Sequence, residues 1–301
     1  MTVAFSYLAR PAKHVLRQLL AEACRRLAPV ASPATYRYVG FGGLEFVDFE
    51  LFRRALGINP MISIEHDERR HERYRFNRPF AEIELLAGRA SDRLPELEWA
   101  TLSIVWLDYE WAVVHEVLAD VGFLSHELLP GSVLIVTANA VSPRPADSRR
   151  ATLAENVGEE RVPPGATDES LAQWGWAAAQ RDVLVDTTDT EFATRRDGAR
   201  LEQLFDFVYA DGAEMQTWGG IVKSPGNERL VEQCHFEDLD FIRRRGDEAL
   251  EIRVPVLTRR ETLHLNRQLP MESGQRLEGV GIVDEELEAY ARFYRWYPAP
   301  S

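Results

Sequence analysis

A short apolar run followed at once by three glycines constrains the fold of this chain more than any other feature. The run covers residues 36–39, and the glycines are Gly40, Gly42 and Gly43. A helical pattern begins soon afterwards, near Glu45. Because glycine has no side chain, the backbone N–H groups of such a turn can approach a ligand closely. The stretch therefore predicts a strand, a ligand-binding turn and a helix, in that order.

Four more short apolar runs follow, starting near residues 61, 82, 101 and 132. They do not alternate polar with apolar residues, which is typical of strands buried on both faces of a parallel sheet. Helical patterns lie between them, so the chain predicts a Rossmann-like, doubly wound α/β sheet. Asp211 and Gly212 form a tight-turn pair between two later β-type runs. They predict an antiparallel hairpin that completes the mostly parallel sheet.

The 301 residues are enough for one large domain with appended segments. We expect an N-terminal helical segment over residues 1–30, where apolar residues recur at helical spacing. The Rossmann-like domain is expected over residues 31–225. Several prolines weaken the pattern at about 141–200, which predicts an insertion there. Residues 226–301 are expected to form a helical C-terminal appendage.

Several polar residues stand where helices are expected to begin, because their side chains can accept the free N–H groups of a first helical turn. Asp67 and Ser91 precede the helices after the second and third strands. Asp168 is expected to begin a helix after the proline-rich part. Thr258 opens a capping-box sequence, and Asp284 begins the last helix.

Composition narrows the class of protein. The formal net charge of −13 disfavours a general nucleic-acid binder, which normally carries a basic face. The two cysteines, Cys24 and Cys234, give neither a disulfide framework nor a metal-ligand spacing. The N-terminus lacks a signal-peptide pattern, and no apolar run approaches the roughly 18 residues of a membrane span. We therefore expect a cytoplasmic protein that spans no membrane.

The carboxyl ends of the expected strands carry the candidate site residues, because ligands bind beyond those ends in open parallel sheets. Besides the glycine turn, these ends present Glu65, Gly88, Arg89, Ala90, Asp108 and Asn139. Glu65 stands roughly 25 positions after Gly40, a distance that suits a carboxylate for the ribose hydroxyls of a nucleoside cofactor. The set predicts a cofactor site of this kind.

At this point the chain resembles the class I S-adenosylmethionine-dependent methyltransferase superfamily, over about residues 36–139. Three segments are similar to small-molecule O-methyltransferases: Ala87-Gly88-Arg89-Ala90, Leu107-Asp108-Tyr109, and the stretch from Leu134 to Asn139. The resemblance implies S-adenosyl-L-methionine as the cofactor. It implies that Gly40, Phe41, Gly42 and Gly43 surround the methionine part of the cofactor and that Glu65 binds the ribose. Gly88, Arg89 and Ala90 would then lie by the adenine, and Asp108 near the transferred methyl group.

The chain departs from the superfamily pattern at three places. Tyr38 stands where such enzymes usually have an acid, two residues before the first glycine. The Asn/Asp-Pro-Pro-aromatic motif of amino-methyltransferases is replaced by Asp-Tyr-Glu-Trp from Asp108, which favours oxygen over nitrogen as the acceptor atom. Ala138 replaces the acid of the metal-dependent enzymes' Asp-Asn pair. Asp108 and Asn139 alone are too few oxygen ligands, so we predict no metal.

Asp108 is the candidate catalytic residue, either to orient the acceptor or to remove its proton. It can equally be a cap of the following helix. Tyr109 and Trp111 are candidates for the wall of the substrate pocket, together with Asn139. Arg10 and Lys13 can face an anionic group or form a solvated helix start. No sequence motif identifies the acceptor, which is a small molecule or a protein. No motif indicates the oligomeric state either.

Two other functions compete with methyl transfer. An NAD(P)-dependent oxidoreductase also uses a glycine turn and a later acid, but it would want a third glycine where Glu45 stands. A catalytically degenerate methyltransferase-like domain that acts as a binding or scaffold protein is the other alternative. Tyr38 and Ala138, at the places of two expected acids, motivate it. Cofactor binding without turnover would favour the scaffold.

Overall fold

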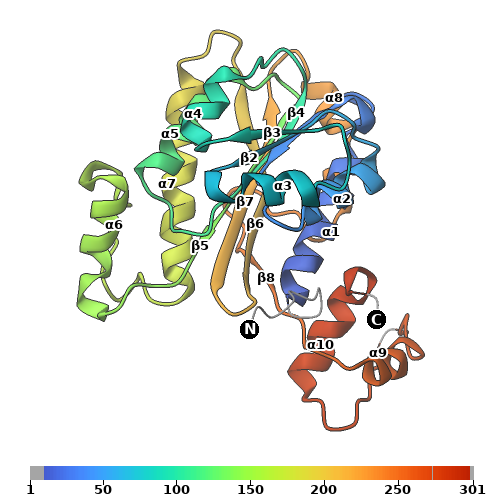
Figure 1. The fold of residues 1–301 in the computed structure, drawn as a ribbon. Helices are drawn as coiled ribbons and strands as arrows, with labels where there is room; N and C mark the ends of the chain where they lie inside the picture. Colours follow the sequence, from blue (N-terminus) through green and yellow to red (C-terminus); the bar gives the residue numbers. More distant parts are fainter. Residues whose placement is uncertain (1–9, 273, 299–301) are drawn as a thin grey trace.

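One eight-stranded sheet organises the computed structural model, which describes residues 10–272 and 274–298 (Figure 1). The strand order is β3-β2-β1-β4-β5-β7-β6-β8. The strands are β1 (Arg37–Gly40), β2 (Met61–Glu65), β3 (Ile83–Ala87), β4 (Ser103–Asp108), β5 (Val133–Asn139), β6 (Arg200–Ala210), β7 (Glu214–Lys223) and β8 (Leu250–Ile252). Strands β1 to β5 pair in parallel, and β7 runs antiparallel between β5 and β6. The predicted doubly wound sheet with a late hairpin is confirmed.

Helices cover both faces of this sheet (Figure 1). One face carries α1 (Pro11–Arg25), α2 (Val47–Leu56), α3 (His71–Asn77) and α8 (Glu228–Glu232). The other carries α4 (Ala90–Arg93), α5 (His115–Glu127), α6 (Arg149–Val157) and α7 (Trp174–Ala193). The central strands are buried on both sides because neighbouring residues enter different cores. Tyr38 and Trp106 pack under α1 and α2, whereas Val39 and Val105 pack under α5 and α7.

The cap predictions have mixed outcomes. Asp67 accepts the N–H of Arg69, and Thr258 forms the predicted capping box with Glu261 at the start of α9 (Arg259–Asn266). The predictions for Ser91 and Asp168 are wrong. Ser91 lies inside α4, which begins at Ala90. Asp168 precedes α7 by several residues, and its carboxylate accepts the N–H of Arg150 in the first turn of α6 (2.7 Å).

The first helix is part of the main core. Helix α1 packs against α2 and under the sheet through its apolar stripe. Its first turn is capped from far along the chain, because Asp211 in the β6–β7 turn accepts the N–H groups of Ala12 (3.2 Å) and Lys13 (2.7 Å). The predicted hairpin thus holds the start of the N-terminal helix.

The C-terminal part adds both a strand and a small second core. Strand β8 pairs in parallel with β6 and extends the sheet by a strand that the sequence did not predict. Beyond it, α9 and α10 (Asp284–Phe293) pack around a cluster of Leu257, Leu265, Leu277, Leu287 and Tyr290. Figure 1 places α9 and α10 at the end of the molecule where α1 begins and the β6–β7 turn lies.

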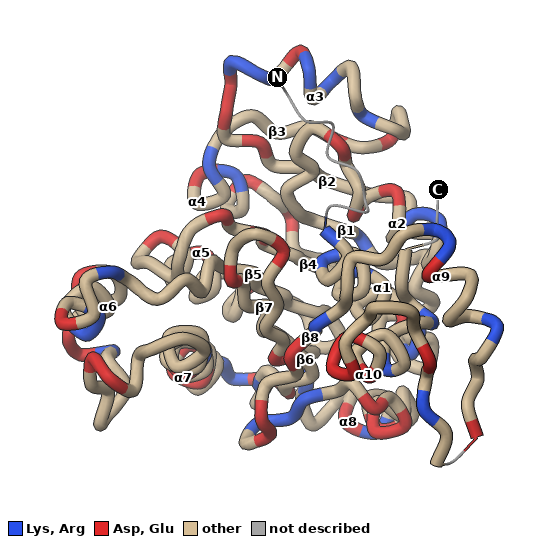
Figure 2. Tube along the Cα trace, turned by 90° about the horizontal axis from the view of Figure 1, so that it is seen from below, with Lys and Arg blue, Asp and Glu red and all other residues tan. Residues whose placement is uncertain are grey.

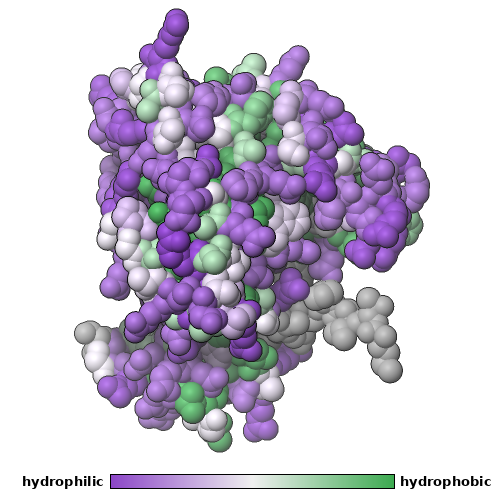
Figure 3. Space-filling view, turned by 90° about the vertical axis from the view of Figure 1, so that its left-hand side faces the viewer, coloured by the Kyte–Doolittle hydropathy of each residue, from purple (hydrophilic) through white to green (hydrophobic). Residues whose placement is uncertain are grey.

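The surface is polar and mixed in charge. Seen from that end, acidic and basic residues are interspersed along the chain (Figure 2). The face on the side of α6 and α7 is mostly hydrophilic, with small hydrophobic patches (Figure 3). None of the helices within the described ranges has the length and apolar character needed to cross a membrane.

Candidate functional site

The carboxyl ends of β1, β2, β4 and β5 bring four predicted site residues to one edge of the sheet. Gly40, Glu65, Asp108 and Asn139 are the last residues of these strands. Because the strands run in parallel and pair side by side, their ends lie next to one another. This edge of the sheet is therefore the candidate site.

The glycine turn is held in place by Glu65. The N–H groups of Gly42 and Gly43 donate to Oε1 of Glu65 at 2.8 and 2.9 Å, and the hydroxyl of Ser63 donates to the same oxygen at 2.6 Å. A Cβ on Gly42 would lie 2.4 Å from the ring of Phe46, so only glycine fits there. Gly43 has a φ of +59°, and a Cβ there would meet nothing within 4 Å. Its backbone therefore borders open space that a ligand can enter.

Glu65 also holds the glycine turn, a structural role that the sequence did not reveal. From its place after the second strand, Glu65 is expected to face a ribose, whereas its Oε1 binds the loop. Oε2 makes none of these three bonds, so it is the oxygen left for a ligand. Burial raises the pKa of Glu65, and the bonds from Ser63, Gly43 and Gly42 oppose that shift. Ser63, two residues before Glu65 on β2, therefore belongs to the candidate site, and no pattern in the sequence pointed to it.

The third predicted segment lies beside Glu65. The N–H of Gly88 donates to the backbone carbonyl of Glu65 at 2.9 Å. Ala90 is buried at the start of α4. The side chain of Arg89 forms an exposed ion pair with Glu116 on α5 (2.9 Å). Of this segment, the structure therefore brings Gly88 and Ala90 to the candidate site, while the guanidinium of Arg89 reaches the neighbouring helix.

Asp108 forms an ion pair with Lys13 of α1. A second ion pair joins Arg17, one helical turn later, to Asp48 of α2. Burial lowers the pKa of Lys13, but the negative charge of Asp108, together with smaller contributions from Tyr209 and Asp48, more than offsets it, so the pKa lies above its usual value. Lys13 and Arg17 stand four positions apart on one helix face, and this spacing was the available signal that both point inward.

Two buried tyrosines surround these ion pairs. Tyr38 stacks on Phe52 at 4.8 Å between ring centroids, and a Cβ on Gly40 would lie 2.9 Å from its hydroxyl. Tyr209, at the end of β6, is only 1% exposed, and its hydroxyl has no hydrogen-bond partner among the residues that the structure describes. Burial raises the pKa of Tyr209 to about 12, while the charge of Lys13 acts to lower it. A buried polar atom without a partner points to a ligand at this place.

A row of aromatic rings closes the other side of the edge. Phe41 contacts Tyr109 at 5.3 Å between centroids, Tyr109 contacts Trp111 at 5.4 Å, and Trp111 contacts His66 at 6.2 Å. Trp111 is 41% exposed, so this row offers a partly open aromatic surface. The hydroxyl of Tyr109 donates to buried Asp120 at 2.6 Å, which fixes its ring.

The burial of Asp120 makes stability depend on pH. It raises the pKa of Asp120 to about 6, above the usual value of about 3.9, although the hydrogen bond from Tyr109 acts to lower it. The folded protein therefore holds this proton more tightly than the unfolded chain does, and the free energy of unfolding falls as the pH rises from about 4 to about 6. Asp120→Asn keeps an acceptor for Tyr109 and removes the charge. We expect it to raise the free energy of unfolding at neutral pH by about 2 kcal/mol.

Urea unfolding of both proteins at pH 4 and at pH 7 checks this expectation. The two should be similar at pH 4, where Asp120 is protonated, and should diverge at pH 7. A substituted protein that is less stable than the parent at both values would contradict the assignment.

Two further candidates have mainly structural contacts. The backbone carbonyl of Asn139 accepts a bond from Gln180 (3.0 Å), and its side-chain oxygen accepts the N–H of Val141 (2.9 Å). The N–H of Asn139 donates to the carbonyl of Trp111 at 3.0 Å, so Asn139 ties the aromatic row to β5. Arg10 is exposed at the start of α1.

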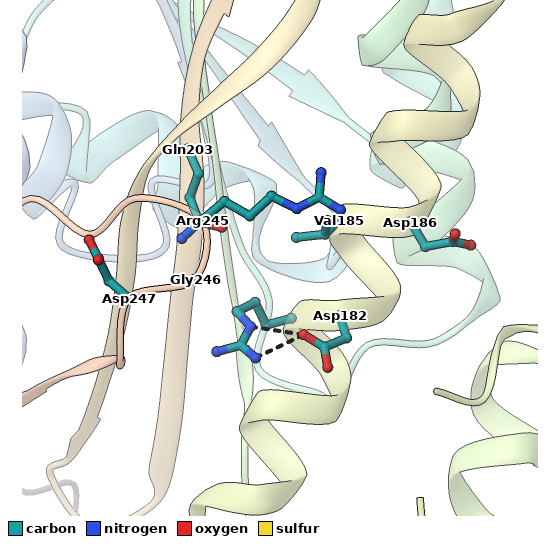
Figure 4. Close-up of a pocket in the computed structure, with 8 residues that line it drawn as sticks. Asp182, Val185, Asp186, Gln203, Arg245, Gly246 and Asp247 are labelled. Carbon is teal, nitrogen blue, oxygen red and sulfur yellow. Dashed lines mark hydrogen bonds and ion pairs between the residues drawn. The ribbon is translucent and has the colours of Figure 1, made fainter. Parts of the chain in front are cut away.

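A separate cavity of about 310 Å³ lies between α7 and residues 243–247 (Figure 4). Its lining residues are Arg181, Asp182, Val185, Asp186, Gln203, Arg245, Gly246 and Asp247. None of the predicted site residues lines it. Gln203 stands well before Tyr209 on β6, so this cavity lies away from the carboxyl edge of the sheet.

Within residues 10–272 and 274–298, no group of three or more histidine, cysteine, aspartate or glutamate side chains is arranged to hold a metal ion. Asp108, the strand-end carboxylate considered for such a role, is paired with Lys13 instead. That catalysis uses no metal stays a prediction.

Comparison with known proteins gives two kinds of result. No curated protein matches the sequence. Among solved structures, cofactor-bound Rv0187 from MTB is similar at 18% identity, covers 74% of this chain and 84% of its own, and has a TM-score of 0.41. The O-methyltransferase TomG from Streptomyces achromogenes, in complex with SAM, is 18% identical, with 73% and 92% covered and a TM-score of 0.40. Spermidine synthase from Thermotoga maritima is 10% identical, with 72% and 62% covered and a TM-score of 0.43.

The family comparison covers far more of the chain than the candidate site alone. A model of the family described as "Putative O-methyltransferase" matches residues 5–300. The match includes the glycine turn, the strand ends and the C-terminal helices. It confirms the resemblance to methyltransferases that the strand-end residues predicted, and it supports S-adenosyl-L-methionine as the cofactor. Because the match extends over nearly the whole sequence, the protein belongs to this methyltransferase family.

Proposed function

We propose that this protein transfers a methyl group from S-adenosyl-L-methionine to an acceptor, and that the methylated atom is oxygen rather than nitrogen. The observation that carries the proposal is the glycine turn at the carboxyl edge. The backbone of Gly43 borders open space, and Oε1 of Glu65 accepts the N–H groups of Gly42 and Gly43. The family description and the Asp-Tyr-Glu-Trp sequence from Asp108 support oxygen as the acceptor atom.

The residues at this edge fit the parts of the cofactor. When bound, S-adenosylmethionine supplies a methyl group that is already activated on a sulfonium sulfur. We assign Gly40, Phe41, Gly42 and Gly43 to the methionine side, and Glu65 to the ribose through Oε2. Gly88 and Ala90, with the backbone of Arg89, border the adenine. The orphaned hydroxyl of Tyr209 agrees with a polar ligand at this edge.

The protein's own contribution is then positioning. Asp108 orients the acceptor oxygen or accepts its proton, since it ends the central strand beside the glycine turn. Tyr109 and Trp111 form one wall of the acceptor pocket. We assign the remaining walls to the variable parts: the start of helix α1 with Arg10, the segment at about 141–200, and the appendage after residue 225. The proposed acceptor is a small molecule or a protein, and the two buried cysteines suit a cytoplasmic setting.

A thermal-shift titration tests the cofactor first, with S-adenosylhomocysteine as the ligand and NADH as the comparison. At about a hundred times its dissociation constant, a ligand stabilises by roughly 2.7 kcal/mol. Gly42→Arg should abolish the shift, because a side chain there collides with Phe46. Gly226→Arg is the control, since that glycine is exposed and follows the end of antiparallel β7, at the edge of the sheet opposite the carboxyl ends of β1 to β5. A shift with NADH alone would promote the oxidoreductase alternative.

The acceptor atom is tested with a methyl donor that carries ¹³C in its methyl group. The protein is incubated with a mixture of hydroxyl and amine compounds or with a protein extract, and the products are examined by NMR. The carbon chemical shift separates O-methyl from N-methyl products. Labelled N-methyl products alone would overturn the preference for oxygen. Cofactor binding with no labelled product from any acceptor would favour the scaffold alternative.

A further inference from the structure

Lysine is rare in this chain, and its positions are informative. Of the 35 lysine and arginine residues, only Lys13 and Lys223 are lysines. Both are buried and ion-paired. Lysine presents a compact ammonium with three donors, whereas arginine presents a wide planar fork. A chain that uses arginine almost everywhere keeps the compact cation at these two places.

The two lysines differ in the number of carboxylates that form ion pairs with them. Lys223 lies at the end of β7 and contacts two carboxylates, those of Glu202 (3.0 Å) and Glu228 (3.1 Å). Lys13 contacts Asp108, which is the one carboxylate paired with it in the described part of the chain. An ammonium can donate three hydrogen bonds, so Lys13 retains donors for another oxygen.

The Lys13–Asp108 pair lies at the carboxyl edge of the sheet, where a ligand is expected. Asp108 ends β4 next to β1, which leads into the glycine turn. The unpartnered hydroxyl of Tyr209 lies close enough that Lys13 and Asp108 are the two charges with the largest effect on it. The second pair, Arg17 with Asp48, lies one helical turn further along α1, near enough that Asp108 also acts on the charge of Arg17. The place where an acid is usually found is occupied by Tyr38, which is packed in the apolar core.

The Lys13–Asp108 pair is complementary in charge to an α-amino acid zwitterion, which carries a carboxylate next to an ammonium. Each charge of such a ligand finds an opposite charge on the protein, and charge-assisted hydrogen bonds are the strong ones. We propose that Lys13 binds the α-carboxylate and Asp108 the α-ammonium group of the methyl donor. This pair takes the place of the missing strand acid, with Tyr209 donating the additional bond. The inference rests on the proposed function.

The test compares two ligands that differ only in this part. S-adenosylhomocysteine carries the α-amino acid, whereas 5′-methylthioadenosine keeps the nucleoside and the thioether and lacks it. We expect Lys13→Met to weaken binding of S-adenosylhomocysteine by about 10- to 100-fold in calorimetric titrations, from the loss of a charge-assisted bond. Binding of 5′-methylthioadenosine should change less than about twofold. Lys223→Met, the matched control, should bind both ligands as the parent protein does.

Because the chain has only two lysines, a measurement on the unsubstituted protein gives an independent answer. Labelling lysine with ¹³C at Cε yields two side-chain NMR signals, assigned with the Lys223→Met protein. S-adenosylhomocysteine should shift the Lys13 signal, and 5′-methylthioadenosine should leave it nearly in place. This measurement stands even if Lys13→Met fails to fold.

The outcomes separate the two proposals. If both ligands bind and both lose affinity equally in Lys13→Met, or if both shift the Lys13 signal alike, the zwitterion assignment is wrong while the cofactor stands. If the unsubstituted protein binds neither ligand, the proposed function fails, and this inference fails with it.

Discussion

Arg17→Met is expected to lower the free energy of unfolding by about 3–5 kcal/mol, because it leaves the buried carboxylate of Asp48 without its partner. Both side chains are largely removed from water, and burial acts against the charge of Arg17 unless Asp48 is present. Methionine fills a similar volume, so the loss reports the unpaired charge rather than a cavity. Urea unfolding monitored by circular dichroism measures the difference.

Two further variants test whether the unpaired charge causes this loss of stability. The double substitution Arg17→Met and Asp48→Leu removes both charges and should recover most of the loss, because replacing a whole buried pair by apolar residues is often neutral. Arg25→Met breaks the exposed pair with Glu22 on the same helix and should cost less than about 1 kcal/mol. A double substitution that is less stable than Arg17→Met alone would contradict the buried-charge explanation.

Glu65→Ala is expected to weaken binding of S-adenosylhomocysteine by about 100-fold or more. The substitution removes the acceptor for two loop N–H groups and also the oxygen assigned to the ribose. Each hydrogen bond to a charged group contributes about 1.5–3 kcal/mol, so two such losses correspond to this factor. Calorimetric titration measures the affinity directly.

Glu65→Gln separates the two tasks of this residue. Its carbonyl oxygen can still accept from Gly42 and Gly43, so the turn keeps its shape, but the charge is gone. We expect an intermediate loss of about tenfold. If Glu65→Ala binds the ligand as tightly as the parent protein, Glu65 neither holds the loop for the ligand nor contacts it.

The sheet was predictable because its central strands carry a strong local signal. The central strands β1, β2, β4 and β5 are largely buried on both faces, and a residue such as Trp106 or Val105 has no exposed side on which polarity would be tolerated. Strand β3 lies at the edge of the sheet, and its Glu84 is exposed. The β6–β7 hairpin is marked by its own tight turn at Asp211 and Gly212. Strand β8 has only three residues, and its identity as a strand comes from pairing with β6 rather than from its own sequence.

Helix starts were less predictable, because a capping side chain need not act on the helix next to it. Asp168 accepts the N–H of Arg150, 18 residues earlier in the chain, in the first turn of α6. Ser91 lies inside a four-residue helix that begins at Ala90. Local spacing identifies a residue that is able to cap but not the N–H that it will reach.

The sequence predicted which strand ends form the candidate site, but it did not predict the side-chain contacts within it. The spacing from Gly40 to Glu65 brings a carboxylate to the glycine turn, and the structure places it there. That Glu65 accepts from the turn depends on side-chain conformation. The pairing of Lys13 with Asp108 joins residues 95 positions apart and depends on how α1 docks, which no local pattern encodes.

The contact between α1 and the β6–β7 turn sets an order for synthesis. Asp211 lies 199 positions after Ala12, whose N–H it accepts. At about 5–20 residues per second, a ribosome needs roughly 10–40 s to make that stretch. The first helix to emerge therefore waits for the β6–β7 turn before its first turn is capped. The carboxylates that pair with Arg17 and Lys13, those of Asp48 and Asp108, are made earlier, so the cap is the last of these three contacts to become available.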